Sequence, residues 1–262
     1  MTARWAMFCE ARGDFRTASG LVERVLREHG ADWLRDLLDA FPETVREWVG
    51  PDGETPFFDT HRTYREALRR GIRLRYGFFD GVPAAPGALA LYTAAQLVSS
   101  LRAKATPDEP WALIYVWDAD RQGTLRREGL EQARREATAL LADGALVLGI
   151  AEPNRESWVL AGFVPEGPDE QRRLDALRQA LGFWPNETPE RLTAQDEHAR
   201  HHTKPVLRAL LGDDTDREAR CWSDAPFDAL VRRGAGNGLA AFLAEVKREL
   251  LPQVDPGARG VR

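Results

Sequence analysis

Carboxylates stand directly after two apolar runs that lie far apart in the sequence. The run MFC at 7–9 is followed by Glu10, and the run WALIYVW at 111–117 is followed by Asp118, with Asp120 two positions further on. Residues two apart on an extended backbone point to the same side, so Asp118 and Asp120 can face one ion. Hard cations such as Mg²⁺ prefer oxygen ligands and commonly use one or two carboxylates with water and phosphate oxygens. The pattern therefore favours a divalent-metal site.

Solvated turns are the alternative interpretation of these acidic residues. Asp is common after any strand, and an isolated DxD pattern has little specificity. Three carboxylates packed together without a cation would raise at least one of their pKa values by like-charge repulsion, and a metal ion removes that penalty. Asp14, four residues after Glu10, and Glu156 are further candidate metal ligands.

Alternating strands and helices would position these side chains. Strands are predicted at about 5–10, 72–79, 111–120 and 145–153, and helices at about 15–28, 88–103 and 124–144. This alternation predicts an α/β fold, with a parallel four-stranded sheet flanked by helices on both faces. Because ligands bind at the carboxyl ends of the strands in such sheets, we expect Glu10, Asp118 and Asp120 to meet at one edge.

The pattern changes along the chain and predicts two regions. Residues 1–165 are expected to form the α/β domain, with an insertion of short helices at about 31–70. Beyond Pro165 helices dominate, so residues 166–262 are expected to form a helical C-terminal extension. Its helices are predicted at about 168–182, 203–211, 225–233 and 237–250.

Composition limits the classes of partner. Apolar residues make up 43% of the chain and the net charge is −5, so a full core is expected and any nucleic-acid contact needs a local basic patch. The run HRTYREALRRGIRLR at 61–75 is the candidate patch, and a solvated helix face is an equally good interpretation. Without a signal peptide or a long apolar segment, we expect a cytoplasmic protein with no membrane contact.

Two spacings resemble the motifs of the TOPRIM domain. Glu10 and Asp14 have the spacing of its first motif, EGxxD, with Ala11 in place of the usual glycine, and the run VWDAD matches its second, a buried strand ending in DxD. The chain is similar to small stand-alone bacterial TOPRIM-like proteins and to the TOPRIM nuclease half of OLD-family proteins. The resemblance covers about residues 5–165.

Later segments carry weaker resemblances. In PNRESWVLAGF, at 153–163, Glu156 matches a family segment whose terminal aspartate is replaced here by Gly162. The run HHTKPVLRALL, at 201–211, resembles a later KP-containing helix start and contains Lys204.

The resemblance implies metal-dependent phosphodiester chemistry. Mg²⁺ or Mn²⁺ would be held by Glu10, Asp118 and Asp120, and Glu10 can alternatively act as a general base. Lys204 would stabilise the phosphate transition state, although a solvated surface lysine is the alternative. Of the neighbouring histidines His201 and His202, a helix geometry lets only one serve such a site.

Three functional hypotheses follow. The first is a metal-dependent nuclease or related phosphotransfer enzyme acting on DNA or RNA, in bacterial defence or DNA processing. The second is a catalytically weak TOPRIM-like interaction subunit of a defence or DNA-processing complex. The third is a DxD sugar-nucleotide transferase, which would make the spacing of Glu10 and Asp14 a coincidence. Because the chain contains no P-loop, an ATPase would have to be a separate protein subunit.

Overall fold

A parallel sheet forms the centre of the molecule. The computed structural model describes residues 2–79, 81–106, 109–119, 123–194 and 196–260. Within them, four parallel strands pair in the order β2-β1-β6-β7. The short strand β3 pairs with the last residues of β1, Phe8 and Cys9, whereas β2 pairs with its first residues. The strands are β1 (Ala3–Cys9), β2 (Arg46–Trp48), β3 (Phe58–Asp59), β6 (Trp111–Asp118) and β7 (Ala145–Ala151).

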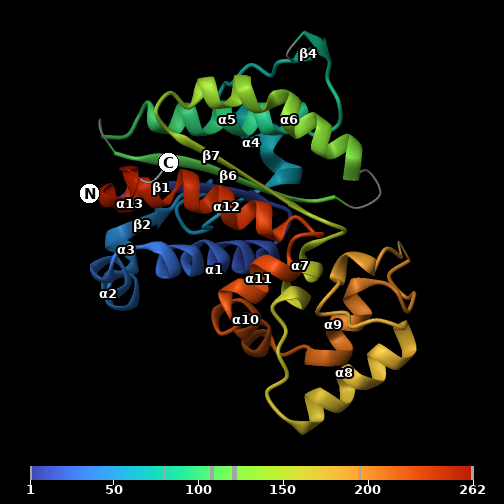
Figure 1. The fold of residues 1–262 in the computed structure, drawn as a ribbon. Helices are drawn as coiled ribbons and strands as arrows, with labels where there is room; N and C mark the ends of the chain where they lie inside the picture. The colour runs from blue at the N-terminus through green and yellow to red at the C-terminus, as the bar shows by residue number, and fades with distance from the viewer. Residues whose placement is uncertain (1, 80, 107–108, 120–122, 195, 261–262) are drawn as a thin grey trace.

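Helices cover both faces of this sheet (Figure 1). On one face lie α1 (Arg12–His29) and α12 (Leu239–Glu249), and on the other α5 (Ala88–Arg102) and α6 (Gly123–Leu140). Neighbouring side chains of β1 alternate between the two resulting cores, with Met7 in the first and Phe8 in the second. Both faces are buried, which explains why β6 is a continuous apolar run and not an alternating one.

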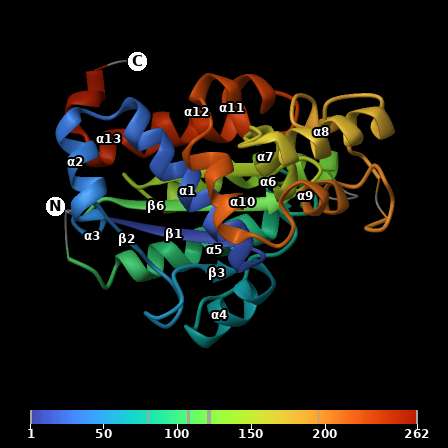
Figure 2. The same cartoon turned by 90° about the horizontal axis from the view of Figure 1, so that it is seen from below.

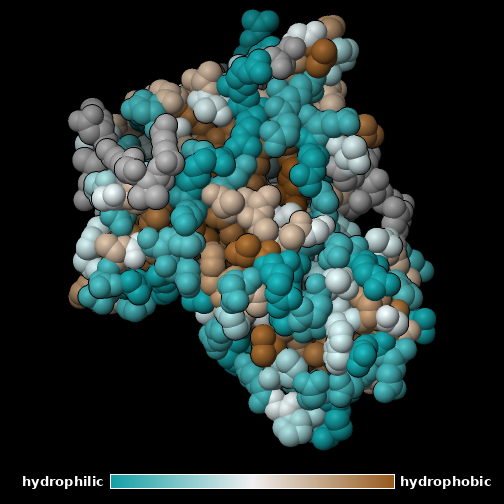
Figure 3. Space-filling model, in the orientation of Figure 1, coloured by the Kyte–Doolittle hydropathy of each residue, from teal (hydrophilic) through white to brown (hydrophobic). Residues whose placement is uncertain are grey.

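The remaining helices lie around this three-layer core. Figure 2 shows α8 and α9 beyond the end of the sheet toward which its strands run, and α4 on the side of β3. No helix in the described residues is long and apolar enough to cross a bilayer. Hydrophilic residues cover most of the face seen in Figure 3. The helices around the core are α2 (Asp32–Ala40), α3 (Pro42–Val45), α4 (Thr63–Arg69), α7 (Arg155–Ala161), α8 (Pro168–Leu181), α9 (Thr203–Leu211), α10 (Thr215–Ser223), α11 (Phe227–Arg233) and α13 (Leu251–Val254).

The prediction of a sheet strand at 72–79 is wrong. Only Phe78–Phe79 forms a strand there, β4, and it pairs with β5 (Val82–Pro83) in a separate antiparallel hairpin. The period-two pattern before it has another cause, since Ile72 and Leu74 pack against the core beneath α5 and α6. The edge of the sheet is supplied instead by β2 and β3, inside the segment expected to be an insertion of short helices.

Close backbone packing fixes α7 against α10. Gly162 follows α7 with φ −90° and ψ −5°, so the backbone is unstrained there. A Cβ added to Gly162 would lie 1.7 Å from the carbonyl oxygen of Cys221 on α10. The aspartate of the resembling segment therefore has no room at this position while α10 packs as it does.

We expect Gly162→Ala to destabilise the fold by about 1–3 kcal/mol, because the added methyl group must push two helices apart. Thermal unfolding measures the loss. Gly167→Ala is the control, since its backbone is extended and a Cβ there meets no atom within 4 Å. Similar melting temperatures for the two variants would contradict the close packing.

Candidate active site

Parallel pairing delivers two acidic residues to the same edge of the sheet. Strands β1 and β6 are neighbours, with Phe8 opposite Tyr115, so the chain leaves both strands at one end. Glu10 and Asp118 line the same cavity there, of about 910 Å³. Glu10 and Asp118 therefore lie at one edge of the sheet, as expected, while Asp120 lies outside the described residues.

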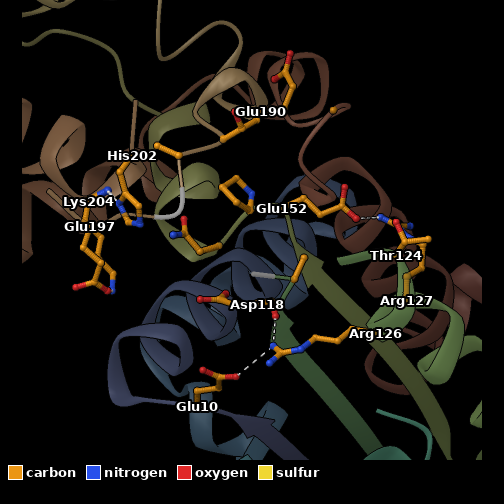
Figure 4. A pocket seen from close by; sticks show the side chains of 16 residues that line it. Glu10, Asp118, Thr124, Arg126, Arg127, Glu152, Glu190, Glu197, His202 and Lys204 are labelled. Carbon is orange, nitrogen blue, oxygen red and sulfur yellow. Dashed lines mark hydrogen bonds and ion pairs between the residues drawn. The ribbon is translucent and has the colours of Figure 1, made fainter. Parts of the chain in front are cut away.

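The cavity lies between the ends of the strands and the segment that leads into α9. Glu10, Asp118 and Arg126 lie at the ends of the strands and at the start of α6, and Glu197 and Lys204 lie across the cavity from them (Figure 4). A volume of this size is typical of small-molecule and cofactor sites. The lining is rich in both signs of charge, which suits a ligand that is itself charged.

Arg126 lies between the two strand ends. Its Nη1 is 3.8 Å from the Glu10 Oε1 and donates a hydrogen bond to the carbonyl oxygen of Asp118. Its guanidinium also stacks over the Trp117 ring, 4.5 Å from the centroid. A cation is thus already held beside the carboxylate of Glu10 by the protein itself.

Asp118 is oriented by the start of α7. Its Oδ1 accepts a hydrogen bond of 2.9 Å from the backbone amide of Arg155. The Arg155 side chain points to a different set of groups: it ion-pairs with Asp14 at 3.6 Å, with Glu156 at 3.3 Å and with Glu218. The carboxylates of Asp14 and Glu156 therefore lie against Arg155, and neither lines the cavity.

Asp14 also serves the first helix. Its Oδ2 accepts a hydrogen bond of 2.8 Å from the Ala11 amide, as in a capping box. Burial raises the pKa of Asp14, and the Ala11 amide and the Arg155 guanidinium lower it only in part. Ala11 itself has φ −145° and ψ 168°, an extended conformation open to any residue. Alanine in place of the motif glycine consequently brings no backbone strain.

Lys204 enters the cavity from α9. Its Nζ lies 2.5 Å from the Glu197 Oε1, and this hydrogen bond raises the pKa of Lys204, with further contributions from the charges of Glu156, Glu197 and Asp118. The neighbouring His202 lines the cavity and caps α9, its Nδ1 accepting from the Lys204 amide at 3.2 Å. Lys204 therefore stays protonated at neutral pH opposite the acidic strand ends.

The arrangement of oxygen donors is compatible with a hard divalent ion. Within the described residues, no three His, Cys, Asp or Glu side chains are placed to hold a metal. Glu10 and Asp118 supply two carboxylates, and the third predicted ligand, Asp120, is not among the described residues. Mg²⁺ commonly binds through one or two carboxylates and completes its coordination with water and phosphate oxygens. Asp14 and Glu156, which were predicted as further ligands, are not part of this donor set, because both pair with Arg155.

Two arginines of the cavity are absent from the prediction made on the sequence. Arg126 and Arg127 follow the DxD run at the start of α6, where Arg127 ion-pairs with Glu152 at the end of β7. Their signal was the position: basic residues in the first turn of a helix that follows an acidic strand end return to that edge of the sheet. Comparisons with protein-family models, with curated proteins and with solved structures found no match to the chain.

A raised pKa makes Asp14 a source of pH-dependent stability. The folded protein binds a proton at Asp14 more tightly than the unfolded chain does, so ionised Asp14 costs stability at neutral pH, and this cost disappears as the pH falls to its unfolded pKa. Asp14→Asn keeps an acceptor for Ala11 and removes the charge. We expect it to be at least as stable as the wild type near pH 7, with the difference shrinking toward about pH 4.

Urea unfolding of both proteins across this pH range measures the effect. A variant that is much less stable at neutral pH, with a deficit that vanishes in acid, would show instead that the ion pair with Arg155 outweighs the burial of Asp14.

Proposed function

We propose that the chain is a metal-dependent nuclease, hydrolysing phosphodiester bonds of nucleic acid in the cavity at the ends of β1 and β6. The observation that carries this proposal is the presence of Glu10 and Asp118, from two neighbouring parallel strands, in one cavity that also contains Lys204. The spacing of Glu10 and Asp14 and the VWDAD run, which resemble the two TOPRIM motifs, support the same chemistry.

The acidic residues would act as the metal-binding part of the site. Glu10 and Asp118 would hold Mg²⁺ or Mn²⁺, with Asp120 as the further ligand that the DxD pattern implies. When bound, such an ion supplies an activated water molecule and neutralises charge on the scissile phosphate. The hydrogen bond from the Arg155 amide would keep the Asp118 carboxylate turned in one direction throughout.

The basic residues would act on the phosphate. Arg126 stands at the strand ends and Lys204 faces them across the cavity, so a phosphate at Glu10 would have cations on two sides. Cations aimed at the position where charge develops stabilise the transition state more than the ground state. Lys204 would have to exchange its partner Glu197, with which it forms an exposed and therefore weak ion pair.

The second candidate function is a catalytically weak interaction subunit. Arg126 beside Glu10 favours it, because a guanidinium already compensates this carboxylate without a metal ion. A separate ATPase or other protein subunit is the protein partner that we propose for a defence or DNA-processing complex. The two functions differ in the effect on nucleic-acid cleavage that is expected when the charge of Asp118 is removed.

The first expected outcome is cleavage of labelled DNA or RNA with Mn²⁺ or Mg²⁺ that EDTA stops. Asp118→Asn should reduce the rate by at least 100-fold, on the order of the loss of one key electrostatic group. Asparagine keeps an acceptor for the Arg155 amide, so folding should be preserved. Activity that survives this substitution would indicate a contaminating nuclease, and inactivity with metal and partner present would favour the interaction subunit.

A second outcome separates metal binding from catalysis. Mn²⁺ should raise the melting temperature of the wild type, and Glu10→Gln or Asp118→Asn should remove most of this shift, because a ligand stabilises only the state that binds it. Lys204→Met should leave the metal-induced shift unchanged while lowering kcat by about 100-fold. An equal loss of the shift in Lys204→Met would argue against its role at the phosphate.

A further inference from the structure

A second cavity adjoins Glu10. It has a volume of about 540 Å³, and Glu10 is the residue that it shares with the active-site cavity. Its walls come from the loop at 51–57, from β3 and from α4, segments that contribute nothing else to the candidate active site. We call it the α4 cavity. A phosphate held at Glu10 would lie between the active-site cavity and the α4 cavity.

Aromatic side chains make one wall of the α4 cavity rigid. Phe58 is buried and stacks on Phe8 with ring centroids 4.7 Å apart, and Phe57 stacks on Phe15 at 5.5 Å. Both rings are thus fixed by the core of the sheet and by α1. A preformed pocket with an apolar wall suits a flat organic group such as a base or a sugar.

Three arginines line the same cavity. Arg62, Arg65 and Arg69 recur at three- and four-residue spacing, which places them along one side of α4. Arg62 is 74% exposed and pairs with Asp59 at 3.1 Å, and Arg69 is 69% exposed and pairs with Glu66 at 3.5 Å. Exposed pairs of this kind contribute little stability, so these guanidinium groups can turn to a phosphate at small cost.

The carboxylates of the cavity are already satisfied by the protein. Asp52 accepts hydrogen bonds from the amides of its own loop, including Thr55 at 2.7 Å, and Asp59 accepts from the His61 amide at 2.8 Å. Glu66 pairs with Arg70 at 2.7 Å. Arg65 makes no ion pair within the part of the chain that the structure describes. Arg65 is therefore the guanidinium of the cavity that a phosphate can meet without displacing a carboxylate.

We propose that the α4 cavity binds the nucleotide next to the reacting phosphate, and that the substrate is consequently a single strand of DNA or RNA. The inference rests on the proposed function, which supplies the position of that phosphate. The binding of a strand in the α4 cavity does not depend on cleavage. Because the two cavities meet at Glu10, neighbouring nucleotides of a bound strand would have to unstack and enter different cavities. Bases that are not paired in a duplex do this readily. Arginines beside aromatic walls are a common means of holding such strands.

Binding without cleavage tests this proposal. Fluorescence anisotropy is measured in EDTA with labelled oligothymidylate and oligouridylate of about 12 nucleotides and with a DNA duplex of the same length. The single strands should bind more tightly than the duplex. Arg62→Ala and Arg65→Ala should each weaken binding roughly fivefold at about 0.1 M salt, and each should lower the slope of log K against log salt by about 0.7.

Arg172→Ala is the matched control for Arg62→Ala. Arg172 lies on α8, is 72% exposed and pairs with Asp169 three residues before it, as Arg62 pairs with Asp59. It should leave affinity and salt slope unchanged. The better-bound of the two single strands distinguishes DNA from RNA as the source of the ligand.

Each result decides between the two proposals. Equal affinity for duplex and single strand, or losses in Arg62→Ala and Arg65→Ala no larger than in Arg172→Ala, would overturn the α4 cavity as a single-strand site and leave the nuclease proposal standing. Single-strand binding that depends on Arg62 and Arg65, in a protein that cleaves nothing with any metal, would support the binding site and remove the enzyme.

Discussion

Arg155 connects the acidic end of β6 to three helices. Its amide donates to Asp118, and its guanidinium reaches Asp14 on α1, Glu156 on α7 and Glu218 on α10. Burial disfavours the charged guanidinium, yet the surrounding carboxylates outweigh that cost and raise the pKa of Arg155. Loss of Arg155 would leave the three carboxylates without their shared cation, which is strongly destabilising. The orientation of the Asp118 carboxylate and the packing of α1, α7 and α10 therefore depend on the same residue, the first through its backbone amide and the second through its guanidinium.

Local spacing predicted where acidic residues leave the sheet, but not which of them share a cavity. Glu10 and Asp118 could be placed because an apolar run followed by a carboxylate marks a strand end, and parallel strands end together. Asp14 and Glu156 have equally suggestive spacing and lie against Arg155 instead. That choice is made by a long-range ion pair, and no pattern within a few residues of either carboxylate encodes it.

The edge of the sheet illustrates the same limit for the fold. The helices and inner strands were predictable because burial on one or both sides leaves a period in the sequence. The alternating segment at 72–79 carries such a period, but its Ile72 and Leu74 pack against the core although the segment does not pair with the sheet. The strands β2 and β3 are so short that they leave no period, and only their pairing with β1 defines them.

The position of Arg126 links the resting site to the proposed chemistry. Its guanidinium stacks on Trp117 while contacting Glu10, so the indole can keep the side chain in place when its charge changes partner. A divalent ion at Glu10 would repel Arg126 from the carboxylate, and a substrate phosphate in the cavity would attract it. The same arginine that compensates Glu10 in the resting protein would in this way become a phosphate ligand in the complex. An interaction subunit needs no such exchange, because Arg126 already compensates the carboxylate of Glu10 in the resting protein.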